Sequence, residues 1–127
     1  MSKAIVVDDS RTIRRILGGV LGELGFEVGQ AENGREALAL VAREREAGAP
    51  VTLALVDWNM PEMNGLEFVR QLRADPGNAA IIVVMVTTET EVGQMVAALE
   101  AGANEYVMKP FTKDVIQDKL RLLGVVQ

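Results

Sequence analysis

The stretch that decides the fold is residues 51–65, VTLALVDWNMPEMNG, in which an unbroken apolar run ends on a carboxylate, Asp57. A run of about six β-compatible residues without polar alternation is typical of a strand buried on both faces, as in the centre of a parallel sheet. Pro61 and the pair Asn64-Gly65 then favour a turn and the start of a helix. The sequence therefore predicts that Asp57 lies at the carboxyl end of a central strand, the edge where ligands bind in open α/β sheets.

Three further apolar runs also end on polar residues. Residues 4–7 lead to Asp8 and Asp9, residues 81–86 lead to Thr87, and residues 106–108 lead to Lys109. If the strands are parallel, these side chains emerge beside Asp57 at one edge of the sheet. Three carboxylates, a hydroxyl and an ammonium group predict a functional site, because charged groups are rarely buried without a partner.

The composition narrows the function classes. At 127 residues, the chain fits one domain, and we expect residues 1–127 to form a single unit without an output domain. A net charge of −5 without a basic cluster argues against nucleic-acid binding. The absence of Cys and His excludes disulfides, thiolate chemistry, catalytic triads and the usual zinc sites. Without a leader pattern or a long apolar run, we expect a cytoplasmic protein that makes no membrane contact.

The strands alternate with segments of helical spacing. Helices are predicted at about residues 10–24, 34–46, 65–74, 91–101 and 112–123, and a weaker second strand at residues 26–31. Five strands that alternate with five helices predict a doubly wound α/β sandwich.

The same spacing predicts which helix residues face the sheet. We expect the first helix to bury Ile13, Ile16, Leu17, Val20, Leu21 and Leu24, the fourth Val92, Met95, Val96 and Leu99, and the last Val115, Ile116, Leu120 and Leu123. Gly18, Gly19 and Gly22 fall on the opposite side of the first helix, where we expect them to face solvent.

The acidic group predicts a metal site. Asp8 and Asp9 beside Asp57 would repel one another unless they are protonated, paired or bound to a cation. Mg²⁺ suits them, because it prefers oxygen ligands and combines one or two carboxylates with water and phosphate. Lys109 cannot bind that ion, but it can meet a phosphoryl oxygen beside the Thr87 hydroxyl. This inventory predicts phosphoryl transfer to Asp57.

At these residues the chain closely resembles the receiver domain of two-component response regulators, in particular the stand-alone chemotaxis regulators of the CheY type. The resemblance spans the whole chain and is carried by Asp8-Asp9-Ser10, Asp57-Trp58-Asn59-Met60-Pro61 with Gly65, Met85-Val86-Thr87, Ala101-Gly102-Ala103, and Tyr106 with Lys109-Pro110-Phe111. It implies a single flavodoxin-like (βα)5 domain with a five-stranded parallel sheet of order 2-1-3-4-5.

The resemblance also implies the chemistry of the site. Asp57 accepts a phosphoryl group from a phosphohistidine on a sensor histidine kinase. Asp8, Asp9, Asp57 and the main-chain carbonyl of Asn59 surround Mg²⁺, while Lys109 contacts the phosphoryl group. Beyond its own phosphorylation and dephosphorylation, such a protein is not an enzyme.

A second set of roles concerns the response. By resemblance, Thr87 and Tyr106 relay the presence of the phosphoryl group, Asn59 and Glu89 tune its hydrolysis, and the Lys109–Pro110 bond is cis. The surface that changes is expected around Val92, Met95, Tyr106, Met108 and Lys119. A mixture of apolar and basic side chains there fits a short segment of a downstream protein, such as a flagellar motor switch component. We expect the chain to be a monomer.

Two departures from the family concern rates and partner choice. Thr88 stands where alanine is common, and the first helix is unusually rich in glycine. Neither departure removes a chemical group that the proposed reaction needs.

Other functions fit less well. A phosphatase with an aspartyl nucleophile usually places a second acid two residues later, where this chain has Asn59. An interaction module without phosphate would have no need of all five polar positions, and the glycine-rich fingerprints of nucleotide-binding domains are absent. A stand-alone receiver that serves a phosphorelay or acts as a phosphate sink outside chemotaxis remains an alternative.

Overall fold

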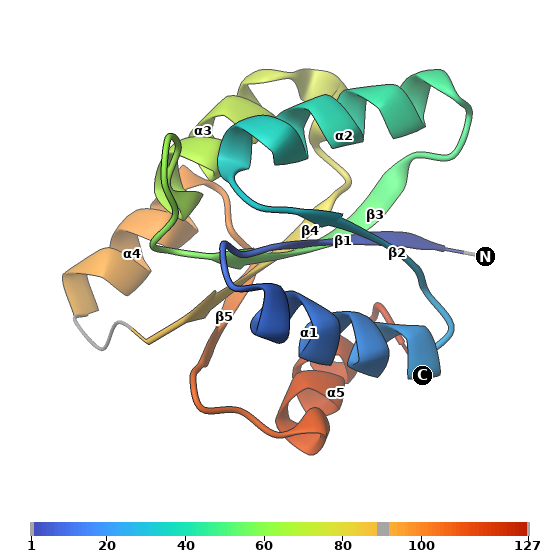
Figure 1. Cartoon of the computed structure of the whole chain (residues 1–127). Coiled ribbons are helices and arrows are strands. Elements are labelled where there is room, and N and C mark those ends of the chain that lie inside the picture. Colours follow the sequence, from blue (N-terminus) through green and yellow to red (C-terminus); the bar gives the residue numbers. More distant parts are fainter. Residues whose placement is uncertain (1, 89–91, 127) are drawn as a thin grey trace.

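Five parallel strands form one sheet in the computed structural model, which describes residues 2–88 and 92–126 (Figure 1). They are β1 (Lys3–Val7), β2 (Glu27–Ala31), β3 (Val51–Asp57), β4 (Ile82–Thr87) and β5 (Glu105–Met108). Their order is β2-β1-β3-β4-β5, and every neighbouring pair is parallel. The flavodoxin-like order expected from the sequence is therefore confirmed.

Helices cover both faces of the sheet. They are α1 (Arg11–Glu23), α2 (Gly34–Glu46), α3 (Gly65–Ala74), α4 (Val92–Ala101) and α5 (Lys113–Leu122), with a 3₁₀ turn, η1, at Pro76–Asn78. Figure 1 shows α1 and α5 on one face and α2 and α3 on the other. Within the described part of the chain, no helix has the length and apolar character that crossing a membrane requires.

Four of these helices begin at a capping side chain. Ser10, Asn33, Asn64 and Thr112 each accept a hydrogen bond from the main-chain N–H three residues further on. Each such cap stabilises its helix by about 1 kcal/mol, because it satisfies a donor that the first turn leaves without a partner. The caps fix where the helices start, and therefore how long the loops after β1, β2, β3 and β5 are.

Two apolar cores lie on the two sides of the sheet. One joins Phe68, Val69 and Leu72 of α3 to α2, α4 and one face of the strands. The other joins α1 and α5 to the opposite face. In β3, every residue except Thr52 is buried, as predicted for a central strand.

The predicted helix faces need correction at several positions. Ile16 is 48% exposed, and Arg14 is buried instead; Val96, Leu99 and Val115 are also exposed. Apolar spacing marks a stripe wider than the sector that touches the sheet, and α4 buries the small residue Ala98 in the core. Gly19 and Gly22 do face solvent, whereas a Cβ at Gly18 would touch Val28 and Gln30 of β2.

Candidate functional site

Asp57 is the last residue of β3, and its side chain is largely buried, with the residue 8% exposed. The turn after it is closed by a hydrogen bond of 2.9 Å from the Gly65 N–H to the carbonyl of Trp58. Any Cβ at position 65 would overlap the carbonyl oxygen of Asp57 and lie 2.8 Å from Cε of Met85. Only glycine therefore lets α3 begin so close to the end of β3.

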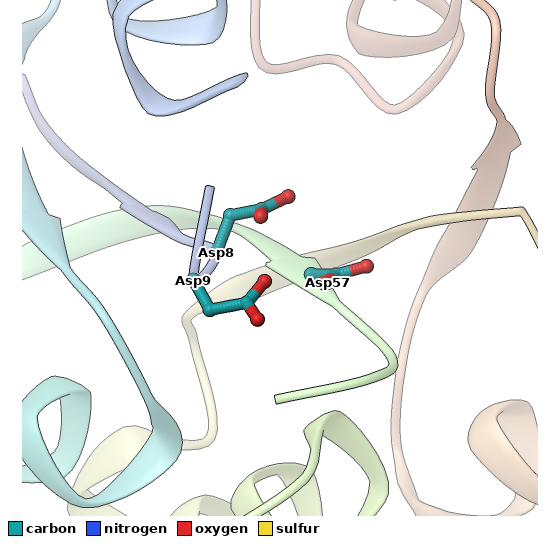
Figure 2. A group of neighbouring side chains, drawn as sticks. All are labelled: Asp8, Asp9 and Asp57. Carbon is teal, nitrogen blue, oxygen red and sulfur yellow. The ribbon is translucent and has the colours of Figure 1, made fainter. Parts of the chain in front are cut away.

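Asp8 and Asp9 follow β1, the strand beside β3. Asp8 is 1% exposed, and its Oδ1 accepts a hydrogen bond of 2.8 Å from the Ser10 N–H. Asp9 is exposed. Figure 2 shows these two carboxylates and that of Asp57 at the same edge of the sheet.

The three carboxylates fit a divalent cation. One oxygen from each of Asp8, Asp9 and Asp57 lies within 4.8 Å of the other two. The group could therefore hold a metal ion, and oxygen ligands from carboxylates are those that Mg²⁺ prefers. Asn59, whose carbonyl is the expected fourth ligand, lies exposed in the loop that begins at Trp58.

Lys109 follows β5 and reaches two of the carboxylates. Its Nζ lies 3.0 Å from Oδ2 of Asp8 and 3.3 Å from Oδ1 of Asp57. The Lys109 N–H donates to the carbonyl of Thr87 at 2.8 Å, which continues the β4–β5 pairing to the site. The Lys109–Pro110 bond is cis, as expected. The ammonium group therefore compensates part of the negative charge.

The pKa shifts follow from this crowding. Burial and the neighbouring charge of Asp8 raise the pKa of Asp57, although the charge and hydrogen bond of Lys109 act against them. Burial lowers the pKa of Lys109, but the hydrogen bond to Asp8 and the charges of Asp57 and Asp8 outweigh it, so the pKa is raised overall. Negative charge at Asp57 is thus disfavoured, and any added cation would relieve the repulsion.

Thr87 and Tyr106 lie on the neighbouring strands β4 and β5. Thr87 ends β4 and is 4% exposed, while Tyr106 lies in β5, half-buried. Both line a cavity of about 10 Å³ together with Met95 and Gln94 of α4. The Lys119 ammonium lies 5.4 Å from the centre of the Tyr106 ring. The two predicted switch residues therefore share a small space beneath α4.

The structure describes only some of the remaining residues predicted for hydrolysis and for the response surface. Met95 and Met108 are half-buried at the edge formed by α4 and β5. Glu89 and the side chain of Val92 lie outside what the structure describes.

Two features of the site were missed in the sequence. Arg14 was not expected to be buried, although it lies three and seven positions before the buried residues Leu17 and Leu21 and so shares their helix face. The hydrogen bond between Asn33 Nδ2 and Glu62 Oε2, at 3.0 Å, joins the loop after β3 to the start of α2. No spacing in the sequence indicates that contact, because 29 positions separate the residues.

Known proteins that are similar to this chain in sequence or in structure belong to one family. Residues 4–121 match the response regulator receiver domain family. Chemotaxis protein CheY1 of Helicobacter pylori is 44% identical over 122 residues, which cover 95% of both proteins. The chemotaxis protein CheY homolog of Campylobacter jejuni is 44% identical over 119 residues, which cover 93% of this chain and 88% of that protein. Chemotaxis protein CheY4 of Vibrio cholerae has a similar structure, with a TM-score of 0.84 and 33% identity over 96% of this chain and 98% of the other.

Proposed function

Because this chain belongs to the response regulator receiver domain family, we propose that it accepts a phosphoryl group on Asp57 and changes a protein-binding surface in response. The observation that carries the proposal is the meeting of Asp8, Asp9, Asp57 and Lys109 at one edge of the sheet. The close similarity of this chain to CheY chemotaxis proteins supports a response regulator role.

In the proposed reaction, a carboxylate oxygen of Asp57 attacks the phosphorus of a phosphohistidine. The new O–P bond forms as the P–N bond breaks, and the imidazole nitrogen keeps the electron pair. Asp8 and Asp9, with Asp57 and the Asn59 carbonyl, would hold Mg²⁺. When bound, that ion supplies positive charge to the phosphoryl oxygens.

Besides compensating the charge of the carboxylates, Lys109 would bind the new phosphoryl group. Its ammonium group already bonds to Asp8 and Asp57, so a short movement brings it to an oxygen of the new phosphoryl group. Charge-assisted hydrogen bonds of this kind are roughly twice as strong as neutral ones. Lys109 therefore reports the phosphoryl group to β5.

Thr87 and Tyr106 carry the signal to the surface. The Thr87 hydroxyl moves toward the phosphoryl oxygens, and the space it leaves is taken by the Tyr106 ring, which borders the same cavity. The affected surface is made by α4, β5 and α5, around Val92, Met95, Tyr106, Met108 and Lys119. As a two-state switch, it shifts only as far as the difference in phosphate affinity between the states allows.

The proposed partners follow from the same scheme. A sensor histidine kinase donates the phosphoryl group, and a downstream protein, such as a flagellar motor switch component, binds the changed surface. We place the protein in the cytoplasm as a monomer that binds neither nucleic acid nor membrane, with residues 1–127 as one receiver domain. Asn59 and Glu89 admit and orient water, so that the phosphoryl group is short-lived.

The test is phosphorylation by a small donor. Incubated with acetyl phosphate and MgCl₂, the protein should gain the mass of one phosphoryl group, and EDTA should prevent the gain. The matched control is Asp57→Asn, which keeps the shape of the side chain but removes the nucleophilic carboxylate. An equal mass gain in Asp57→Asn would place the phosphoryl group elsewhere.

A further inference from the structure

Arg14 is a buried cation that the proposed chemistry does not use. The residue is 8% exposed, and its contacts join α1 to the ends of two strands. Nη1 donates to the main-chain carbonyl of Asp8 at 2.7 Å, and Nε donates to Oε1 of Gln30 at 3.2 Å. Nη2 lies 3.9 Å from the exposed carboxylate of Glu32. Because arginine is rarely buried without a partner, these bonds account for its position.

The bond to Asp8 bears on the peptide that leads into Asp9. The carbonyl of Asp8 belongs to that peptide, so its direction helps to set where the Asp9 side chain leaves the main chain. The peptide before Asp8 is held as well, since the Asp8 N–H donates to the carbonyl of Ala31 at 3.1 Å. Asp9 itself is exposed, and its orientation depends on the main chain.

We infer that Arg14 is a positioning residue for the candidate metal site. By fixing the peptide between Asp8 and Asp9, it keeps the carboxylates of both residues directed toward that of Asp57. The inference deepens the proposed function and rests on it, in that the ion is the one that phosphoryl transfer uses. Residues that orient metal ligands affect metal affinity even though they do not touch the ion.

Two other roles for Arg14 lead to different results when the side chain is replaced. If only its charge mattered, removing a cation near the site would tighten the binding of a divalent ion, because like charges repel. If the residue only held α1 in place, its loss would lower the free energy of unfolding and leave the affinity of the folded protein unchanged. Of the three roles, only the positioning of Asp8 and Asp9 predicts that the folded variant binds magnesium more weakly.

The experiment is a titration of the unphosphorylated full chain with MgCl₂, followed by the fluorescence of Trp58. Arg14→Met keeps the unbranched stem but removes the charge and every donor. Arg14→Lys keeps the charge but replaces the separate Nε and Nη1 donors of the planar guanidinium by a single ammonium group. The matched control is Arg15→Met, which removes the charge of an exposed neighbour.

We expect the magnesium affinity to fall by about tenfold in Arg14→Met and by less in Arg14→Lys. Arg15→Met should bind like the wild type. A dissociation constant of Arg14→Met equal to that of the wild type, or lower, would overturn the inference. If circular dichroism shows that Arg14→Met does not fold, the dissociation constant of Arg14→Lys is used instead. A value equal to that of the wild type, or lower, would then overturn the inference. Absence of magnesium binding by the wild type would also overturn it.

Acetyl phosphate separates this inference from the proposed function. If magnesium affinity depends on Arg14 but the wild type forms no acyl phosphate, the positioning role stands and the chemistry at Asp57 is wrong. If the wild type is phosphorylated while both Arg14 variants bind magnesium as it does, the chemistry stands and the positioning role is wrong.

Discussion

Gly65 determines how closely α3 approaches the end of β3. Its N–H bonds to the carbonyl of Trp58, and its missing side chain leaves room for the Asp57 carbonyl and the Met85 methyl group. The main chain of Asp57 is part of this contact. A change at position 65 should therefore affect both the stability and the proposed phosphorylation site.

Gly65→Ala should lower the free energy of unfolding by about 1–3 kcal/mol, because the added methyl group has no room. It should also slow phosphorylation by acetyl phosphate, since the overlap displaces Asp57. Urea unfolding measures the first effect and the rate of mass gain measures the second.

The matched control for that change is Gly19→Ala. A Cβ at position 19 meets nothing within 4 Å, so the same chemical change should stabilise α1 by about 1 kcal/mol. Equal stability of the two variants would contradict the steric role of Gly65.

The helices differ in how well the sequence predicted them. Their starts were predicted where a capping residue precedes the apolar pattern, as at Ser10 and Thr112. The meeting of Asp8, Asp9, Asp57 and Lys109 at one edge was also predicted, since parallel strands bring their carboxyl ends together. The exposure of apolar residues on α4 and α5 was not predicted, because spacing shows which residues are apolar but not which of them meet the sheet. The burial of Arg14 depends on partners in other elements, which local patterns do not contain.

Arg73 joins the end of α3 to elements that follow it in the chain. It donates to the carbonyls of Asn78 at 2.8 Å, Ile81 at 2.7 Å and Gly102 at 3.1 Å, and to Oδ1 of Asn104 at 3.0 Å. Gly102 has φ +117°, and a Cβ there would lie 2.7 Å from Cγ of Arg73. These contacts lie at the amino ends of β4 and β5, the edge opposite Asp57.

Arg73→Met should lower the free energy of unfolding by about 2–3 kcal/mol, because it leaves carbonyl groups at this edge without their donor. The rate of phosphorylation of the folded protein should not change, since the site lies at the other edge. Arg70→Met, an exposed position on α3, is the control and should change stability by less than about 0.5 kcal/mol. A strong effect of Arg73→Met on phosphorylation would show that the two edges are coupled.

Across the whole molecule, the proposed response and α2 lie toward opposite ends of the strand order. The cavity shared by Thr87 and Tyr106 lies against α4, whereas α2 and β2 lie toward the other end of the strand order. A response that begins at Thr87 should therefore be confined to α4, β5 and α5.

Hydrogen exchange measured by mass spectrometry should test this arrangement. On phosphorylation with acetyl phosphate, exchange rates should change in α4, β5 and α5 and stay constant in α2. Thr87→Ala should take up the phosphoryl group yet lose most of the change in exchange rates, because it lacks the hydroxyl that is proposed to move. Changes concentrated in α1 and α2 would show that the response surface has been placed wrongly.

The ion pair between Asp8 and Lys109 joins residues that are 101 positions apart, at the two ends of the sequence. During synthesis on the ribosome, the acidic residues of the site emerge first, and their cationic partner emerges only when most of the chain has been made. A growing chain thus contains the proposed phosphate acceptor long before it contains the residue proposed to report the phosphate. Under the proposed function, an unfinished chain that ends before β5 should therefore give no response, because it lacks Lys109.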